Sequence, residues 1–357
     1  MSQLAFSNLS KAFGSFKVFD GLSLAAEAGE IVVIFGSSGT GKTFLLRLIA
    51  GVEEPTTGTI EIGGRDVTEI PPEQRNVGMA FQNFALFPHM SARENIASPL
   101  RAAHADEATV ESGVSRVAKL LKIDHVLGHA PRELSNGQKQ RTALARALAA
   151  EPRILLLDDP LRNVDAKLRF EMRLELPRLL RQSGATVLYV TQDYKEAMAL
   201  ADRIAVLAGG RFVQVGTPEE IYMAPSTLGV AKLFGDPSIN TLETRLSADG
   251  MWVAIRGKDI RIDKAAKLGG REVILGVRPE AVALTQSQVG LPATVMAVTP
   301  LNERVVLLLE SDGGWEFLAS LPSAAADIPE PNTRLSVTFA AEGVHLFDPT
   351  TGERLHG

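Results

Sequence analysis

The stretch IVVIFGSSGTGKTFLLRLIAG, residues Ile31 to Gly51, decides the fold class of this 357-residue chain. The apolar run 31–35 predicts a buried strand, and a helical pattern follows the segment GSSGTGKT. The spacing G-x-x-x-x-G-K-T between a strand and a helix is typical of a loop whose backbone N–H groups wrap a phosphate. The alternative is a glycine-rich turn with a chance lysine. We expect the following residues to bind nucleotide phosphates: Gly36, Ser37, Ser38, Gly39, Thr40, Gly41, Lys42, Thr43 and Phe44.

A second apolar run, RILLLDD at residues 153–159, ends in two aspartates. An acid at the end of a buried strand can hold Mg²⁺ beside a phosphate loop, and Asp158 suits that role. Lys42 is expected to reach the β- and γ-phosphates, and Thr43 is expected to ligate the same Mg²⁺. A helix cap at the strand end is the alternative role for Asp158.

The alternation of apolar runs with helical stretches predicts an α/β domain over residues 1–235. The runs EIVVIFG, RILLLDD, TVLYVT and RIAVLAGG carry almost no polar residues, which favours a parallel sheet buried on both faces. Residues 88–150 contain no strand-like run and predict a helical subdomain. Beyond the segment FGDPSIN, short alternating runs predict a small all-β domain of barrel type over residues 236–357. These runs are WVAIRG, EVILGVR, ATVMAV, RVVLLLE, RLSVTFA and GVHLF.

Composition excludes several classes of protein. The net charge is −5 and neither predicted domain has a basic excess, which argues against a nucleic-acid partner. The absence of cysteine excludes disulfides and thiolate metal sites. The sequence has neither an apolar run of about 18 residues nor a basic segment followed by an apolar core near its start, so we expect no membrane helix and no signal peptide.

The stretch LSNGQKQRTALARALA, residues 134–149, predicts a second helix that faces a phosphate. Ser135 and Gln138 have the spacing of a capping box, and an apolar stripe follows. Free N–H groups beside small residues make another anion site. In this order and spacing, with the phosphate loop and RILLLDD, the chain resembles the nucleotide-binding subunits of ABC transporters, whose signature is LSGGQ.

The resemblance covers nearly the whole chain. FGDPSIN, GVRPE (residues 276–280) and HLFDPTTGERL are similar to the tail of sugar and polyol importer ATPases of the maltose and glycerol-phosphate type, which is an OB-like regulatory domain. The resemblance implies a RecA-like P-loop core with ATP and Mg²⁺ as ligands. It also implies that the signature residues Ser135, Asn136, Gly137 and Gln138 bind nucleotide.

Three further residues receive roles from the resemblance. Phe13 fits the aromatic residue that stacks on adenine, with a plain core residue as the alternative. Gln82 fits the loop glutamine that senses Mg²⁺ and the attacking water and adjoins the membrane subunits. Asp165 fits the loop that crosses to the other ATPase subunit. Nearby hydrophobic residues are expected mostly in the core, with one or two at a docking surface: Phe84, Leu86, Phe87 and Met90.

Four positions depart from the family. Asp159 replaces the glutamate that orients or deprotonates the attacking water, and its carboxylate is one methylene shorter. Gln192 replaces the histidine that contacts the γ-phosphate, and glutamine cannot carry its positive charge. Asn136 replaces a glycine at a position expected to be helical, whereas Gly137 is kept and leaves room for phosphate. Arg162 replaces a small residue; contact with the partner subunit and plain exposure to solvent are equal alternatives.

Our leading hypothesis is a specialised site that binds ATP and turns it over slowly or not at all, in one half of a heteromeric ATPase pair. LSNGQ would then serve the partner's intact site. The implied partners are a non-identical ATPase subunit, two membrane-spanning permease subunits and an extracytoplasmic substrate-binding protein, with this chain peripheral on the cytoplasmic face of the inner membrane. The implied substrate is a sugar, polyol or glycerol compound. The alternatives are a homodimeric transport ATPase that tolerates Asp159 and Gln192, and a regulatory nucleotide-binding protein outside transport.

Overall fold

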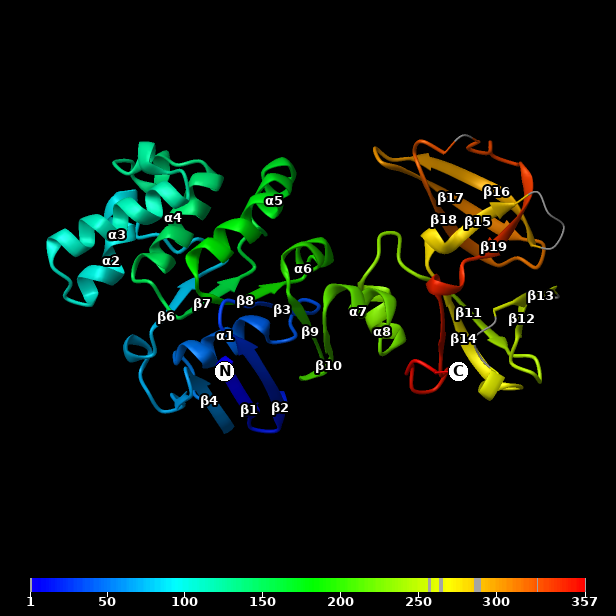
Figure 1. Cartoon of the computed structure of the whole chain (residues 1–357), viewed down its shortest axis with the longest axis horizontal. Coiled ribbons are helices and arrows are strands. Elements are labelled where there is room, and N and C mark those ends of the chain that lie inside the picture. The colour runs from blue at the N-terminus through cyan, green and yellow to red at the C-terminus, as the bar shows by residue number, and fades with distance from the viewer. Residues whose placement is uncertain (1, 256–257, 263–265, 286–289, 326, 357) are drawn as a thin grey trace. The chain divides into compact units, whose positions relative to one another are not determined.

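The computed structural model describes residues 2–255, 258–262, 266–285, 290–325 and 327–356. These residues form two compact units, 1–218 and 219–357 (Figure 1). The last two residues of the predicted run WVAIRG, 256 and 257, lie outside the described residues. Within the described part of the chain, no helix is both long enough and apolar enough to cross a membrane.

A six-stranded sheet forms the centre of the first unit. Its strand order is β10-β9-β3-β8-β7-β6, and every neighbouring pair is parallel except β9 and β10. Burial on both faces explains why β3, β7 and β8 consist almost entirely of apolar residues. The predicted parallel sheet is therefore confirmed. The strands are β3 (Ile31–Phe35), β6 (Val77–Ala80), β7 (Ile154–Asp158), β8 (Thr186–Thr191), β9 (Arg203–Ala208) and β10 (Arg211–Gly216).

A second, antiparallel sheet packs in the same unit, and the sequence patterns above did not predict it. Its order is β2-β1-β4-β5, with β1 (Ser2–Phe13), β2 (Phe16–Glu27), β4 (Thr57–Ile62) and β5 (Arg65–Asp66). The inward residues of these strands join one apolar core with β3 and with helix α1 (Lys42–Ala50). Each fully buried Leu or Ile side chain contributes roughly 1.5–3 kcal/mol to that packing.

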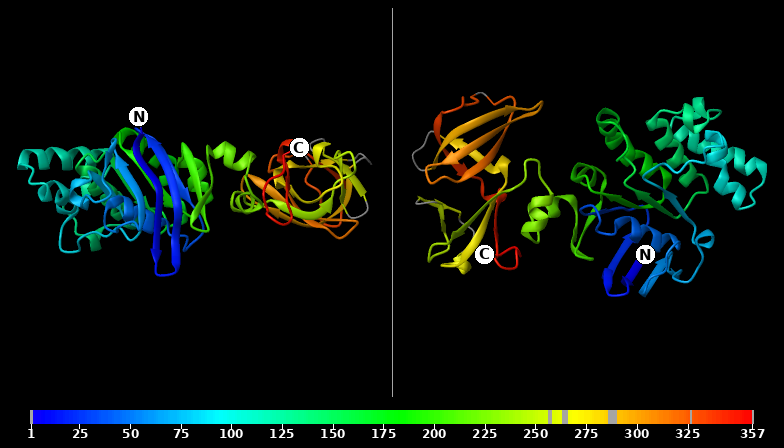
Figure 2. Two further views of the ribbon diagram at one scale, coloured as in Figure 1. Left: turned by 90° about the horizontal axis from the view of Figure 1, so that it is seen from below. Right: turned by 180° about the vertical axis from the view of Figure 1, so that it is seen from behind.

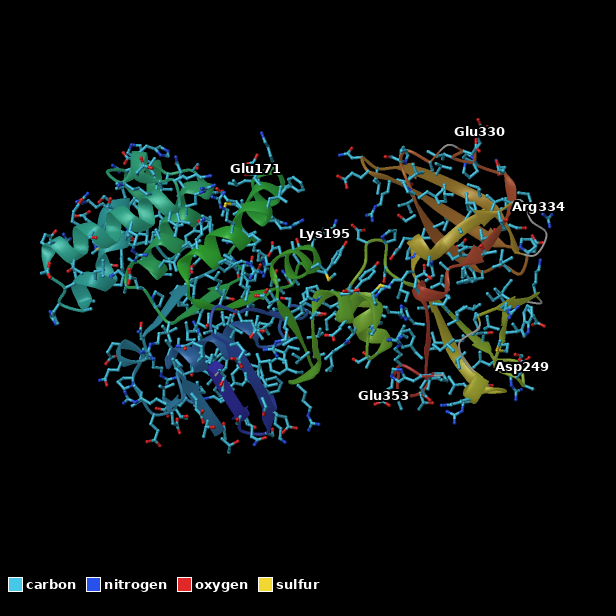
Figure 3. All side chains as sticks on the ribbon, in the orientation of Figure 1. Glu171, Lys195, Asp249, Glu330, Arg334 and Glu353 are labelled. Carbon is cyan, nitrogen blue, oxygen red and sulfur yellow. The ribbon has the colours of Figure 1, made fainter. Side chains whose placement is uncertain are left out.

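Helices cover the parallel sheet, as Figures 1 and 2 show. The segment expected to be helical contains three α-helices and no strand among its residues: α2 (Ala92–Ala102), α3 (Glu107–Leu120) and α4 (Asn136–Ala149). The two remaining helices of the sheet region are α5 (Ala166–Ser183) and α6 (Tyr194–Leu200). Charged side chains such as Glu171 on α5 and Lys195 on α6 are exposed, as Figure 3 shows.

The second unit is mostly β-structure, as its alternating pattern predicts. One sheet has the order β11-β14-β20, another β15-β19-β16-β17-β18, and β12 pairs with β13. A single core, which includes the stacked rings of Trp315 and Phe317, joins these sheets. The strands are β11 (Asn240–Arg245), β12 (Trp252–Ile255), β13 (Lys258–Arg261), β14 (Glu272–Val277), β15 (Val282–Thr285), β16 (Leu291–Pro300), β17 (Arg304–Ser311), β18 (Glu316–Pro322), β19 (Arg334–Phe339) and β20 (Val344–Phe347).

Two short helices, α7 (Pro218–Met223) and α8 (Leu228–Leu233), pack with the second unit. The buried guanidinium of Arg278 donates to the carbonyl oxygens of Ala231 and Phe234, and it also donates to the carbonyl oxygen of Tyr222. This clamp ties the helices to the GVRPE segment. The domain boundary expected after residue 235 follows these helices and stays a prediction.

Candidate nucleotide site

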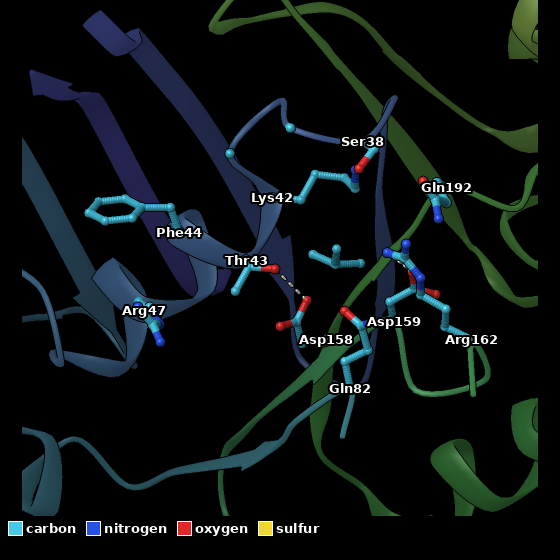
Figure 4. A pocket seen from close by; sticks show the side chains of 13 residues that line it. Ser38, Lys42, Thr43, Phe44, Arg47, Gln82, Asp158, Asp159, Arg162 and Gln192 are labelled. Carbon is cyan, nitrogen blue, oxygen red and sulfur yellow. Dashed lines mark hydrogen bonds and ion pairs between the residues drawn. The ribbon is translucent and has the colours of Figure 1, made fainter. Parts of the chain in front are cut away.

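The parallel register brings four chain segments to one edge of the sheet. The neighbouring strands β3, β8, β7 and β6 all point the same way, so their carboxyl ends lie side by side. The phosphate loop follows β3, Gln192 follows β8, Asp158 ends β7, and Gln82 follows β6. One pocket results, shown in Figure 4. Its lining residues are Ser38, Gly39, Gly41, Lys42, Thr43, Phe44, Arg47, Gln82, Asp158, Asp159, Arg162, Val190 and Gln192.

The phosphate loop depends on glycine at two positions. Gly39 has a φ of 82° and Gly41 a φ of 92°, in the left-handed region that side chains disfavour. A Cβ on Gly41 would also come within 2.8 Å of the Phe19 ring. Because Gly41 caps α1 without a side chain, the first N–H groups of the helix face the pocket. They are available to an anion.

Lys42 lies almost entirely buried beside this loop. Its ammonium donates to the carbonyl oxygens of Gly36, at 2.8 Å, and Ser37, at 2.7 Å. Burial lowers the pKa of Lys42, while the carboxylates of Asp159 and Asp158 act in the opposite direction. The ammonium is thus held within the loop that would receive the phosphates.

Thr43 and Asp158 meet at the floor of the pocket. The Thr43 hydroxyl donates to the Asp158 carboxylate over 2.8 Å, which the dashed line in Figure 4 marks. Burial raises the pKa of Asp158, and the Thr43 hydrogen bond opposes that rise. Two hard oxygen ligands side by side, with the Gln82 amide on the same lining, fit Mg²⁺ bound together with phosphate oxygens. Among the described residues, no group of three or more His, Asp or Glu side chains could hold a metal ion without such help.

Asp159 occupies a constrained position next to Asp158. Its φ is 43°, and its N–H donates to the Val190 carbonyl oxygen on β8 at 2.9 Å. Burial raises the pKa of Asp159 to about 6, and the nearby guanidinium of Arg162 opposes that rise. The Arg162 Nη1 lies 3.7 Å from an Asp159 carboxylate oxygen. Asp159 is therefore anchored by its backbone and paired with a cation, and its role towards the attacking water stays a prediction.

Gln192 lies in the loop between β8, which ends at Thr191, and α6, which begins at Tyr194. Glu196 of α6 contacts the end of β8 next to this loop. Its carboxylate accepts hydrogen bonds from the hydroxyls of Tyr189 (2.8 Å) and Thr191 (3.0 Å). The Thr191 oxygen also accepts the N–H of Asp193, at 3.0 Å. Burial raises the pKa of Glu196 to about 7 despite these hydrogen bonds, and Asp193 and Asp159 raise it further. Glu196 thus fixes the backbone on both sides of Gln192.

Replacing Glu196 with glutamine should make the stability of the protein less dependent on pH. The folded chain binds the Glu196 proton more tightly than the unfolded chain, so stability falls as pH rises from 4.5 to about 7. Glutamine keeps an acceptor for Tyr189 but does not titrate. The gain in unfolding free energy of Glu196→Gln over the wild type should therefore be larger at pH 8 than at pH 5, by roughly 1–3 kcal/mol.

Denaturant unfolding at both pH values measures this difference. Glu171→Gln, on the exposed face of α5, is the matched control and should give the same difference from wild type at pH 5 and pH 8. If Glu196→Gln also gave equal differences at both pH values, the buried carboxyl would not be the group that titrates.

Phe13 lies outside the pocket lining, at the end of β1. It is 54% exposed, so the alternative that assigned it to the core is wrong. Its ring meets the ring of Phe44 edge-on, with centroids 5.7 Å apart, and the Lys11 ammonium lies 5.0 Å from its centroid. An exposed aromatic face next to the phosphate loop is available for stacking; the adenine contact itself stays a prediction.

The signature helix has the predicted start. Ser135 caps α4 and forms the capping box with Gln138, and Asn136 is the first helical residue with ordinary dihedrals. A Cβ on Gly137 would come within 2.5 Å of a Leu168 methyl group on α5. The space that Gly137 leaves is therefore used for packing inside this chain, and the expected approach of a phosphate stays a prediction. The signature residues do not line the pocket that contains Lys42.

Two arginines of the pocket lining carry roles that the sequence did not predict. Arg47 lies one helical turn after Thr43, and that spacing could have placed it on the same face. Arg162 is exposed to solvent, which was one of its two expected alternatives, and its side chain also lines the pocket (Figure 4); the partner contact stays a prediction. Asp165 caps α5 through the Leu168 N–H, and its contact with a partner stays a prediction.

A second hollow lies beside the Gln82 loop. Phe81, Ala85 and Phe87 line it together with Pro99 of α2 and Ala147 of α4. Phe87 is 43% exposed, whereas Phe84, Leu86 and Met90 are partly buried. Arg146 fixes this loop by donating to the carbonyl oxygens of residues 84 and 85. Of these four residues, only Phe87 lines this open apolar groove, and a role for it in docking stays a prediction.

The parallel sheet, the phosphate loop and the aspartates at the end of β7 define a P-loop nucleotide-binding protein. Family models agree: residues 19–162 match an ABC transporter model, residues 235–282 a MalK OB fold domain, and residues 275–347 a TOBE domain.

Relatives that match over nearly the whole chain identify its family more narrowly. The chain is 42% identical to an sn-glycerol-3-phosphate import ATP-binding protein, UgpC, of Cereibacter sphaeroides, over 99% of this chain and 100% of the relative. It is 37% identical to the sulfoquinovosyl glycerol transport ATP-binding protein SmoE of Agrobacterium fabrum, over 100% of both chains. A UgpC of Rhizobium johnstonii is 39% identical over 99% of this chain and 96% of its own. The chain belongs to the family of ATP-binding proteins of ABC transporters, in the group with MalK-type C-terminal domains.

Proposed function

We propose that this chain is the ATP-binding subunit of an importer and that its own phosphate-loop site holds MgATP while hydrolysing it slowly. The observation that carries this proposal is the position of Asp159 and Gln192 on the same pocket lining as Lys42, Thr43 and Asp158. The binding residues are those the chemistry needs, and the two residues for the hydrolytic step are altered.

Binding rests on the loop, the ammonium and the paired oxygens. Phosphate oxygens would accept hydrogen bonds from the N–H groups at the start of α1 and from the ammonium of Lys42. Thr43, Asp158 and Gln82 would hold Mg²⁺, which neutralises charge between the β- and γ-phosphates when bound. Each of these side chains is on the pocket lining.

We expect slow hydrolysis because the Asp159 side chain is short and the Gln192 side chain is uncharged. A base must come within hydrogen-bond distance of the water it activates. The Asp159 backbone is fixed by its hydrogen bond to Val190, so a glutamate carboxylate would extend about 1.5 Å further than aspartate does. Gln192 presents a neutral amide where charge would develop on the phosphate, which weakens stabilisation of the transition state.

The signature helix supports a second role in the same assembly. Its capping box is intact, and its N-terminal residues do not line the nucleotide pocket of this chain. In the family, two subunits pair head to tail and each signature completes the other's site. We therefore propose that LSNGQ completes the site of a non-identical ATPase subunit with an intact glutamate and histidine, and that this second site does most of the hydrolysis.

Membrane subunits would dock in the apolar groove beside the Gln82 loop, which would place the chain on the cytoplasmic face of the membrane as a peripheral subunit. The groove is open, and its lining includes Phe81 and Phe87. The named substrates of the first two relatives share a glycerol unit, which supports a glycerol-type or sugar-type substrate delivered by an extracytoplasmic binding protein.

Affinity purification of the tagged full-length chain from solubilised membranes of its own host tests this assignment. The expected complex contains permease subunits, this chain and a second, different ATP-binding subunit in equal amount to it. Recovery of this chain as the sole ATP-binding subunit would support a homodimeric transport ATPase. Recovery without any membrane subunit would support a regulatory protein outside transport.

A further inference from the structure

Arg162 has a hydrogen-bonded backbone and a half-exposed side chain at the rim of the nucleotide pocket. Its N–H donates to the Asp159 carbonyl oxygen at 3.2 Å, closing a tight turn after β7. Its own carbonyl oxygen accepts from the Arg169 guanidinium at 3.1 Å. The side chain is 45% exposed. These two hydrogen bonds therefore fix the backbone of Arg162, while its exposed guanidinium has space to change its contacts.

The guanidinium is directed into the pocket. It lies 3.7 Å from Asp159, and Figure 4 shows it turned towards that carboxylate with Gln192 on the same side. Three cationic side chains, Lys42, Arg47 and Arg162, are among the described lining residues. Lys42 and Arg47 come from helix α1, whereas Arg162 approaches from the opposite wall beside Asp159.

Gln192 lies on the lining of the same pocket. Gln192 supplies a neutral amide there, and an arginine supplies a permanent charge and a planar fork of donors that matches phosphate oxygens. The 3.7 Å between Arg162 and Asp159 is longer than a hydrogen bond, so this half-exposed guanidinium is held to the buried carboxylate by charge alone. A phosphate group of higher charge would compete well for the guanidinium.

We propose that Arg162 binds the terminal phosphate of ATP in this chain's own site, exchanging its contact with Asp159 for the γ-phosphate oxygens. The proposal rests on nucleotide binding by this site, as proposed above, and adds selectivity to it: Arg162 would make the site prefer ATP over ADP, which lacks that phosphate. A side chain from this chain itself, rather than from a partner, would then hold the nucleotide in its unhydrolysed form.

Equilibrium binding to the full-length chain tests the proposal, with fluorescent AMP-PNP and ADP as probes in the presence of Mg²⁺. Arg162→Ser should weaken AMP-PNP binding about 10-fold, the effect of losing one charge-assisted hydrogen bond, and should change ADP binding less than about 2-fold. Arg162→Lys should recover part of the AMP-PNP affinity. Arg65→Ser removes an exposed arginine of β5 that is not on the pocket lining, and it should change neither affinity.

Two results would overturn the proposal. Equal weakening of AMP-PNP and ADP by Arg162→Ser would assign Arg162 to the general electrostatics of the pocket. Unchanged affinities together with weaker association of ATPase subunits would assign it to the partner contact. Lys42→Ala separates these outcomes from failure of the proposed function, because loss of both nucleotides in that variant shows that the phosphate loop is the site being measured.

Discussion

The double variant Asp159→Glu, Gln192→His should raise ATP turnover by the purified full-length chain about 100-fold or more, at protein concentrations at which two copies pair and the LSNGQ of each copy completes the site of the other. Both side chains line the pocket that contains Lys42, so both changes act on one nucleotide. Glutamate restores the missing methylene at a backbone position fixed by Val190, and loss of a general base typically costs about 10²–10⁴-fold. Histidine restores a donor that can carry positive charge towards the phosphate.

Steady-state phosphate release at saturating MgATP measures this gain. Each single variant should gain less than the double variant, because the base and the phosphate contact act on the same step. Lys42→Ala in the double variant should abolish the gain. Equal turnover by the wild type and the double variant would mean that aspartate and glutamine already support hydrolysis, as a homodimeric ATPase requires.

Replacing Ser135 with leucine should lower ATP turnover of the assembled transporter about 100-fold or more, although Ser135 does not line this chain's own pocket. The serine caps α4 where the helix N-terminus would meet the nucleotide of the partner subunit. An apolar side chain there removes a hydroxyl donor and covers the exposed N–H groups. Loss of one such donor typically costs about 10²–10³-fold in rate.

Ser91→Leu is a matched control, because Ser91 forms the same capping box with Glu94 at the start of α2. Both variants should lose about 1 kcal/mol of helix stability, whereas the Ser91 variant should keep its ATP turnover. Full activity of the assembled Ser135→Leu complex would contradict the assignment of LSNGQ to the partner's site.

Sequence patterns predicted the parts of the site that depend on local chemistry. Each of three motifs consists of a few neighbouring residues: the phosphate loop, the aspartate at the end of β7 and the capping box of α4. The order of parallel strands then brings the predicted segments to one edge. The antiparallel sheet of β2, β1, β4 and β5 was missed, because its strands expose many polar residues and because β1 pairs with β4 across about 50 residues of sequence.

The side chains that depend on tertiary contacts could not be predicted. Arg162 lies in a turn that begins at Asp159, and the Asp159 backbone is held by a hydrogen bond to Val190 of β8, about 30 residues further along the chain. From the sequence alone, Glu196 would be expected on the exposed face of a short helix. It is buried because the Tyr189 hydroxyl, on a strand that reads as purely apolar, needs an acceptor.

A single-turnover measurement on the wild-type chain shows whether its own site holds ATP without hydrolysing it. The full-length protein, in excess over radiolabelled MgATP, is allowed to bind the nucleotide, and the bound label is identified over time. We expect the label to stay bound as ATP, binding to require Lys42, and the double variant to convert the bound ATP to ADP. Rapid conversion by the wild-type chain, abolished by Lys42→Ala, would contradict this expectation.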